Sequence, residues 1–140
     1  RCQSELIGHF WFLVADFRGN IIWVIFGGLL LFIEYLFAGV ILCVTIIGIP
    51  FGLQIFKLAT LALWPFGRQA VAAEGGMASG CVNLFMNILW ILLAGIWLAL
   101  EHVFIGVLFC VTIIGIPFGL QHFKLAGVAF MPFGRTIVAA

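Results

Sequence analysis

Two glutamates, Glu34 and Glu101, are the residues best placed to do chemistry, because each interrupts a long apolar run. They lie 67 residues apart, and the sequence around the first is repeated around the second. An ionised carboxylate at bilayer depth costs a few kcal/mol, so each should be neutral, paired or facing a polar cavity. The functional interpretation is an ion or proton pathway, and the structural one is a polar contact that fixes helix packing. We favour the structural interpretation, because few other polar groups could line a pathway.

Lys57 is the obvious partner of Glu34 within one copy of the repeat, but helix geometry argues against a direct pair. If the chain turns at Ile49, Glu34 lies 15 residues from the turn and Lys57 lies 8 residues from it. At 1.5 Å per residue their depths differ by about 10 Å, which a lysine side chain closes only in part. Arg68, or a group in the other copy, therefore competes as the partner.

A polar stripe follows each proposed turn. Gln54 and Lys57 lie three residues apart on one helix face, and the second copy repeats this spacing. One interpretation is a pair of stripes that line a central path. We favour an amphipathic second helix near the headgroups, from which the lysine reaches water or anionic lipid. The candidate polar groups within the membrane are therefore Glu34, Glu101, Lys57, Lys124, Gln54 and Gln121.

The histidines argue against a symmetric metal site, because His9, His102 and His122 have no histidine counterparts in the repeat. Tyr35 stands opposite His102, and Ile55 stands opposite His122. No cysteine pair has the CxxC spacing of zinc or redox sites. No cofactor is predicted, although His102 remains a candidate axial ligand for a haem or porphyrin pigment within a larger assembly. No nucleophile–base pair, P-loop or dinucleotide fingerprint is recognisable, so the chain is not expected to be an enzyme.

The composition places these residues in a membrane protein. The chain has 140 residues, of which 66% are hydrophobic and 8% are charged, with a net charge of +1; its mean hydropathy is +1.34. An average soluble domain carries about a quarter charged residues, so this chain cannot cover a globular surface with polar groups. The absence of a basic patch also excludes nucleic acid as a partner. We expect an all-α integral protein of a bacterial inner membrane or an organellar membrane.

The chain is built from two tandem copies. Residues 43–68 and 110–135 are identical at 21 of 26 positions, with the offset of 67 residues that relates the two glutamates. Identity this dense at one offset indicates a duplicated membrane unit. The apolar run at 6–15 is too short to span a bilayer and suggests an interfacial segment. The predicted organisation is an interfacial segment (1–19), a first repeat (20–73), a linker (74–86) and a second repeat (87–140).

Each copy is predicted to contain one long helix and one short helix. Residues 20–47 are apolar apart from Glu34, and as one helix would measure about 42 Å, more than the hydrocarbon thickness. A shorter helix is predicted at 51–64, where Pro65 and Gly67 end it. A proline between two glycines marks the kink or turn that separates the helices. These turn residues are Gly48, Pro50 and Gly52, and in the second copy Gly115, Pro117 and Gly119.

Two further residue types mark predicted helix ends. Asn20 and Asn87 begin the long helices and are predicted N-caps. Several tryptophans near the predicted span ends are expected to act as interfacial anchors, namely Trp23, Trp64, Trp90 and Trp97.

The sequence permits two membrane topologies for each copy, a single crossing or a helical hairpin. Single crossings would place Arg18 and Arg68 on opposite sides, whereas hairpins gather Arg18, Arg68 and Arg135 on one side. We favour hairpins, which makes the copies parallel and relates them by a pseudo-two-fold axis along the membrane normal. The sequence also permits a turn near Gly39, with the glycine–proline segment as a mid-helix break.

The repeated motifs carry a resemblance to a known family. The IIGIPFG core, the following FKLA and the closing WPFGR resemble the YccF-domain family of small bacterial inner-membrane proteins, which also carry two copies of a short domain. The resemblance covers roughly residues 20–140, and the second copy departs from it only in placing Met131 opposite Trp64. It implies an integral membrane protein and supplies no catalytic residues.

Two functions fit these observations. The first is a structural or accessory subunit that packs against the bilayer and against other membrane subunits or itself. The sixteen phenylalanines favour surfaces made for lipid or protein, and small residues such as Gly39 and Cys43 allow close helix approach. The second is a homo-oligomeric channel or transporter of an ion or small solute that uses Glu34 and Glu101. Four short spans enclose a path only with difficulty, so this function requires an oligomer.

Overall fold

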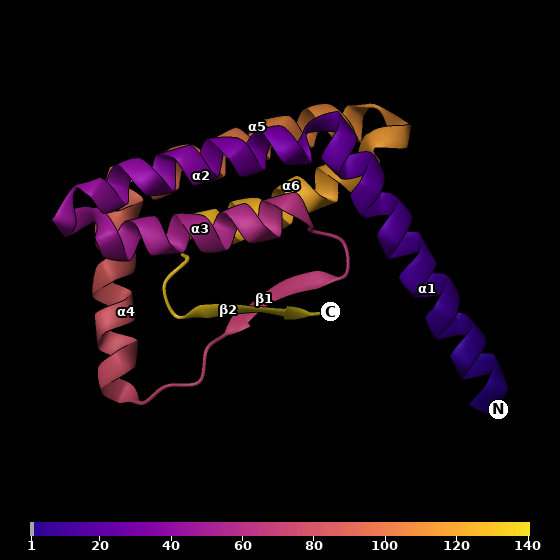
Figure 1. Ribbon diagram of the computed structural model, residues 1–140, viewed down its shortest axis with the longest axis horizontal. Helices are drawn as coiled ribbons and strands as arrows, with labels where there is room; N and C mark the ends of the chain where they lie inside the picture. The colour runs from indigo at the N-terminus through magenta and orange to yellow at the C-terminus, as the bar shows by residue number, and fades with distance from the viewer. Residues whose placement is uncertain (1) are drawn as a thin grey trace.

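The computed structural model describes the backbone of residues 2–140 and the side chains of residues 3–76 and 79–140. The chain is almost entirely helical, as expected, with one small β-ribbon (Figure 1). The elements in chain order are α1 (Cys2–Trp23), α2 (Leu29–Val44), α3 (Ile49–Leu63), β1 (Arg68–Ala72), α4 (Met77–Trp90), α5 (Ile96–Val111), α6 (Ile116–Phe130) and β2 (Arg135–Ala139).

Each repeat forms the predicted helical hairpin. Helix α2 packs along α3, and α5 packs along α6 in the same way. The turn lies just before α3, where Ile46–Gly48 forms a single 3₁₀ turn, and Pro50 falls in the first turn of α3. A proline is tolerated there because the first helical N–H groups lack an intrahelical partner. The alternative turn near Gly39 is wrong, since Gly39 lies inside α2.

The two helices of a hairpin touch at glycines. A Cβ atom at Gly52 would lie 2.8 Å from the carbonyl oxygen of Gly39 and 2.5 Å from the Sγ of Cys43. In the second copy, a Cβ atom at Gly119 would lie 2.6 Å from the carbonyl oxygen of Gly106. Gly52 and Gly119 therefore lie within α3 and α6, at the point of closest helix approach rather than at the turn.

The single long helix expected at 20–47 is broken. A π-helical segment, Val24–Gly28, separates α1 from α2, and within it Gly27 has a non-helical backbone with φ of 158°. Helix α1 therefore leaves the hairpin at an angle, and α4 leaves the second hairpin on the same side (Figure 1). Residues 6–15, expected to be an interfacial segment, form the first part of α1. The Gly27–Gly28 pair is a local turn signal, but it lies within a long apolar run and the break was not predicted from it.

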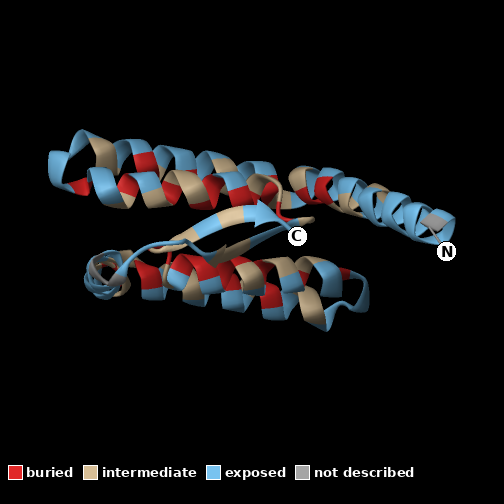
Figure 2. Ribbon diagram, turned by 90° about the horizontal axis from the view of Figure 1, so that it is seen from below, coloured by how far each residue is buried: buried red, intermediate tan, exposed pale blue. Residues whose placement is uncertain are grey.

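The helices carry enough apolar length for a membrane protein. Among the described residues, four helical stretches are long and apolar enough to cross a bilayer: Gln3–Val44, Ile46–Leu63, Ser79–Val111 and Ile113–Phe130. Much of their surface is exposed (Figure 2), and at the first hairpin tip Ile46 and Ile47 are 82% and 88% exposed. Such a surface fits hydrocarbon rather than water.

The two hairpins are antiparallel, whereas the sequence analysis expected parallel copies. Trp23, at the open end of the first hairpin, stacks on Phe118 beside the turn of the second, with ring centroids 6.3 Å apart. Phe51, beside the turn of the first hairpin, stacks on Trp90 at the open end of the second, at 6.0 Å. The turns therefore lie at opposite ends of the molecule (Figure 1). The pseudo-two-fold axis consequently runs across the hairpins rather than along them.

The segments after α3 and α6 form a ribbon that the sequence analysis did not predict. Strands β1 and β2 pair antiparallel, with Ala70 opposite Ile137 at the centre. The ribbon lies against α3 and α6, on the side away from α2 and α5 (Figure 1). Each strand has five residues, and neither RQAVA nor RTIVA alternates polar and apolar side chains, so the usual strand pattern is missing.

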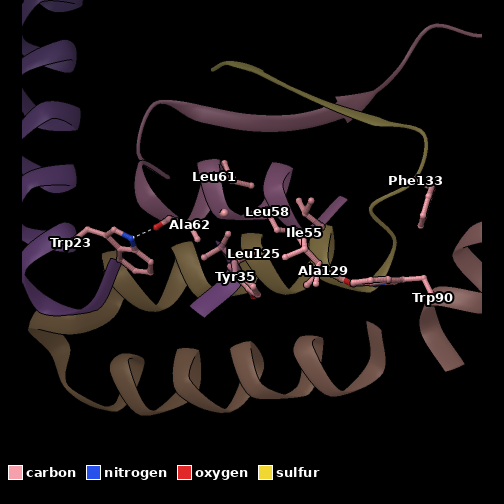
Figure 3. Close-up of a cluster of buried hydrophobic side chains, with 12 residues drawn as sticks. Trp23, Tyr35, Ile55, Leu58, Leu61, Ala62, Trp90, Leu125, Ala129 and Phe133 are labelled. Atoms are coloured by element: carbon pink, nitrogen blue, oxygen red, sulfur yellow. Dashed lines mark hydrogen bonds between the residues drawn. The ribbon is translucent and has the colours of Figure 1, made fainter. Parts of the chain in front are cut away.

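The apolar core lies where α3 and α6 face each other (Figure 3). Leu58, Leu61 and Leu125 are fully buried there, and small alanines let the helices approach. The two tryptophans that end α1 and α4 close the core at its opposite ends.

Candidate functional site

Glu34 and Glu101 lie on α2 and α5, exposed on the layer opposite the β-ribbon. The two carboxylates are within electrostatic range of each other and of the Tyr35 hydroxyl. No lysine or arginine in the described part of the chain forms an ion pair with either glutamate. The two acids therefore form a pair near the pseudo-two-fold axis that no cation of the described residues neutralises.

Beneath these carboxylates, a buried hydrogen-bonded chain crosses between the copies. The Tyr35 hydroxyl is hydrogen-bonded to the Nε2 atom of His102, and the Nδ1 atom of His102 lies 3.0 Å from that of His122. All three side chains are buried. Tyr35 and His102 occupy equivalent positions of the two copies, and equivalent residues near a two-fold axis contact each other. The repeat offset carried this signal, but the sequence analysis interpreted the mismatch only as lost symmetry.

The hydrogen bonds of His102 limit its availability as a ligand for haem or a pigment. Both of its ring nitrogens take part in hydrogen bonds, and the side chain is 1% exposed. An axial bond to a metal would therefore require one of these hydrogen bonds to break. Across residues 2–140, no cluster of three or more histidine, cysteine or acidic side chains could hold a metal ion.

The lysines neither pair with the glutamates nor reach for water. The Lys57 ammonium donates to the Oε1 of Gln54 and to the carbonyl oxygens of Pro132 and Arg135, the last at 3.0 Å. An ammonium has three N–H donors, so these three acceptors satisfy it fully. Its partners belong to the loop that closes the other copy rather than to water or lipid, and its depth relative to the headgroups stays a prediction.

The second copy repeats this contact with one difference. Lys124 donates to the carbonyl oxygens of Pro65 and Arg68, the latter at 2.8 Å. Gln121, the counterpart of Gln54, does not accept from it, and its Oε1 is the buried side-chain atom without a partner in the described part of the chain. Each repeated lysine is thus committed to the closing loop of the opposite copy.

The repeated asparagines hold the same loops. The amide of Asn20 donates to the Phe66 carbonyl at 2.8 Å and accepts from the Phe66 N–H at 2.9 Å. Asn87 clamps Phe133 in the same way, with both distances at 3.0 Å. The prediction that they are N-caps is wrong, because Asn20 lies inside α1 and Asn87 inside α4. The apolar residues before each asparagine extend the helix upstream, so no cap is needed there.

Two tryptophans cap the last turns of the short helices. The indole N–H of Trp23 donates to the Ala62 carbonyl at 2.6 Å (Figure 3), and that of Trp90 donates to the Ala129 carbonyl at 2.7 Å. These carbonyls belong to the final turns of α3 and α6, where backbone acceptors lack an intrahelical donor. Both tryptophans are buried, so they are not the interfacial anchors that the sequence suggested, whereas Trp97 is 70% exposed.

The polar groups therefore divide into two sets. The repeated asparagines and tryptophans bind backbone atoms of their own copy, whereas the repeated lysines bind backbone atoms of the other copy and lock the two together. The second set consists of the acid pair and the tyrosine–histidine chain, which have no such backbone partners. This second set is the candidate functional site.

Comparison with known proteins agrees with this architecture. The family model named YccF, the inner membrane component domain, matches residues 18–68 and 85–135, one match in each repeat. The inner membrane protein YccF of Escherichia coli (strain K12) is 32% identical over 126 residues, which cover 86% of this chain and 85% of that protein. The protein of the same name from Shigella flexneri matches equally well. No solved structure matches the chain.

The resemblance seen in the repeated motifs is thereby confirmed, as is the expectation of an integral membrane protein. The relatives are named for the inner membrane, and the helices described above are long and apolar enough to cross it. With one domain match in each half, the chain belongs to the YccF family and carries two copies of its inner membrane component domain.

Proposed function

We propose that the chain is a non-enzymatic accessory subunit that binds another membrane protein through the α2/α5 face, where Glu34 and Glu101 lie. The observation that carries this proposal is the position of the acid pair, exposed on an apolar surface suited to lipid. Ionisable groups at membrane depth are costly unless they face a partner or a polar cavity. Both lysines of the chain are already bound to backbone carbonyls, so the partner must supply the donor.

The side chains around the acids make this face suitable for packing. On a helix, the residues three and four positions before and after a given residue lie on the same face as that residue. Around Glu34 these neighbours include Leu30 and Phe37, and around Glu101 they include Trp97 and Phe104, all of them exposed. A polar pair within a ring of large apolar side chains favours a packed protein interface, with a lysine, arginine or amide of the partner at its centre.

The alternative is a homo-oligomeric channel or transporter in which Glu34 and Glu101 of several chains line a path. The pairing of the acids near the pseudo-two-fold axis favours it, because assembly about that region would bring more carboxylates together. Within one chain, however, the space beneath the acids is filled by Tyr35 and His102. A path would therefore have to form between chains rather than through one.

Gentle extraction from the native membrane, followed by native mass measurement, tests the proposal. We expect a particle of fixed stoichiometry that contains at least one unrelated membrane subunit. Replacing both acids, Glu34→Gln with Glu101→Gln, should weaken this assembly, because the partner's donor loses its charged acceptors. The matched control is Glu5→Gln with Glu74→Gln, which removes two exposed glutamates elsewhere and should leave the particle intact.

A different result would overturn the proposal. A particle made only of this chain, with solute flux in proteoliposomes that the double variant abolishes while assembly is kept, would establish the channel instead.

A further inference from the structure

A cavity of about 200 Å³ opens beside the kink between α1 and α2. Its walls come from both copies, because Gly27 and Leu31 face Ile105 and Phe109 of the second hairpin across it. Trp23 and Phe118 add two further aromatic surfaces. The cavity exists because the broken helix turns away from the hairpin at Gly27, which leaves the tip of the other hairpin uncovered at that point.

His122 is the one titratable side chain in the lining. Its ring is held between aromatic neighbours, parallel to Phe109 at a centroid distance of 5.5 Å and tilted against Trp23 at 4.9 Å. Its Nδ1 atom is bound to His102, whereas its Nε2 atom has no hydrogen-bond partner among the described residues. The indole N–H of Trp23 is already donated to Ala62. The Nε2 atom of His122 is therefore the side-chain group available to an occupant of the cavity.

The fold itself does not require a histidine at this place. Ile55 occupies the equivalent position of the first copy and is buried in the same way. The Nε2 atom of this cavity-lining imidazole has no hydrogen-bond partner among the described residues, so it can form a hydrogen bond to an occupant. The asymmetry between His122 and Ile55 thus places an imidazole on one side only of an otherwise pseudo-symmetric core.

We propose that this cavity binds a lipid-soluble molecule whose head is a single aromatic ring with one hydroxyl or carbonyl oxygen. A cavity of about 150 Å³ accommodates benzene, so 200 Å³ holds one substituted ring. The ring would pack against Trp23, Phe109 and Phe118, and its oxygen would be hydrogen-bonded to the Nε2 atom of His122. Such a molecule would enter from the bilayer between the kink at Gly27 and the tip of the second hairpin.

The hydrogen-bonded chain fixes what His122 offers to this oxygen. If the Tyr35 hydroxyl donates to Nε2 of His102, then His102 donates from Nδ1, and His122 carries its proton on Nε2. In the opposite direction, His122 donates from Nδ1 and presents a lone pair on Nε2. A hydroxyl group can meet either form, so a phenol is the most suitable probe.

Binding of 4-fluorophenol and fluorobenzene to the full chain in lipid nanodiscs tests this site, with ¹⁹F NMR as the readout and empty nanodiscs as the background. The two probes share a ring and a fluorine but differ in the hydroxyl group. We expect saturable binding of 4-fluorophenol that is about three- to tenfold tighter than that of fluorobenzene, the range of one hydrogen bond. In His122→Ile, which introduces the residue found at the equivalent position of the first copy, the two probes should bind alike.

A second measurement does not depend on a variant. In the unmodified chain with ¹⁵N-labelled histidine, 4-fluorophenol should move the Nε2 resonance of His122, and fluorobenzene should not. Leu30→Trp, which enlarges a side chain in the lining of the cavity, should abolish saturable binding of both probes. Equal affinity of the two probes in the unmodified chain, or an Nε2 resonance that 4-fluorophenol leaves unchanged, would overturn the proposal and leave the cavity as a space filled by acyl chains.

Discussion

Lys57 donates a hydrogen bond of 3.0 Å to the carbonyl oxygen of Arg135, which lies 78 residues further along the chain. In the other direction, Lys124 donates a hydrogen bond of 2.8 Å to the carbonyl oxygen of Arg68. Each copy therefore supplies the cation for the other copy's closing loop. A single copy would lose the hydrogen bonds between its lysine and the other copy's loop carbonyls, which gives a physical reason for the repeat of both motifs in one chain.

Replacing Lys57 with methionine is expected to lower the free energy of unfolding by about 2–3 kcal/mol. The side chain keeps a similar length, but the carbonyl oxygens of Pro132 and Arg135 lose a charged donor, and hydrogen bonds to charged groups contribute about 1.5–3 kcal/mol. Chemical unfolding in detergent, followed by near-ultraviolet circular dichroism, measures the change. The control Arg18→Met removes an exposed cation and should change the free energy by less than about 0.5 kcal/mol. Equal effects of the two substitutions would contradict the interlock.

The indole N–H of Trp23 should contribute separately from its ring. Trp23→Phe retains an aromatic side chain but leaves the Ala62 carbonyl unpaired at the end of α3, at an expected cost of about 1–3 kcal/mol in addition to the lost ring volume. Thermal unfolding provides the measurement. Trp97→Phe makes the same chemical change at an exposed position and should have little effect. A Trp97→Phe variant as unstable as Trp23→Phe would show that the caps are unimportant.

Because the two helices of the hairpin approach closely at Gly52, adding one methyl group there should lower the stability of the fold. In Gly52→Ala, the new Cβ atom would lie 2.8 Å from a backbone oxygen that cannot rotate away, so we expect a loss of about 1–3 kcal/mol from overpacking. The control is Gly127→Ala in α6, where a Cβ atom meets nothing within 4 Å. There the better helix propensity of alanine should raise stability by up to about 1 kcal/mol. Effects of the same sign at both sites would be inconsistent with this packing.

Much of the fold could be predicted from local signals. Apolar length indicated the membrane, the 67-residue offset indicated two copies, and the glycine–proline segment placed the hairpin turn beside Gly48. These features depend on backbone geometry and hydrophobicity within short segments. The kink at Gly27 was not predicted, because the second copy has Ala94 at the equivalent position and the apolar run on both sides outweighed the Gly27–Gly28 signal.

The partners of the polar side chains could not be predicted because they are distant in sequence, in the opposite copy for the lysines and at the far end of the same copy for the asparagines. Carboxylates are the partners that a lysine in an apolar chain suggests, whereas Lys57 binds backbone carbonyl oxygens of a loop. Asn20 likewise suggested a helix start when considered alone, although its amide clamps Phe66 46 residues away. A general signal was nonetheless present. When a polar residue recurs in both copies and its neighbours in sequence offer no partner, the partner should be sought in a backbone motif that is also repeated.

The antiparallel arrangement of the hairpins predicts a distance that parallel copies could not give. In a chain without native cysteines, spin labels at Ile47→Cys and Ile114→Cys, on the two hairpin tips, should lie more than about 24 Å apart, the length of one 16-residue helix. Pulsed electron paramagnetic resonance measures this separation.

The matched pair is Ile47→Cys with Leu92→Cys. Antiparallel packing places these two positions at the same end of the molecule, because Phe51 beside the first turn stacks on Trp90. This pair should therefore show the shorter distance. Parallel copies would reverse the order, because they bring both tips within about 10 Å, the spacing of neighbouring helices, and carry Leu92 to the far end. A shorter distance between the tips than between Ile47 and Leu92 would thus disprove the antiparallel packing and, with it, the exchange of lysines between the copies.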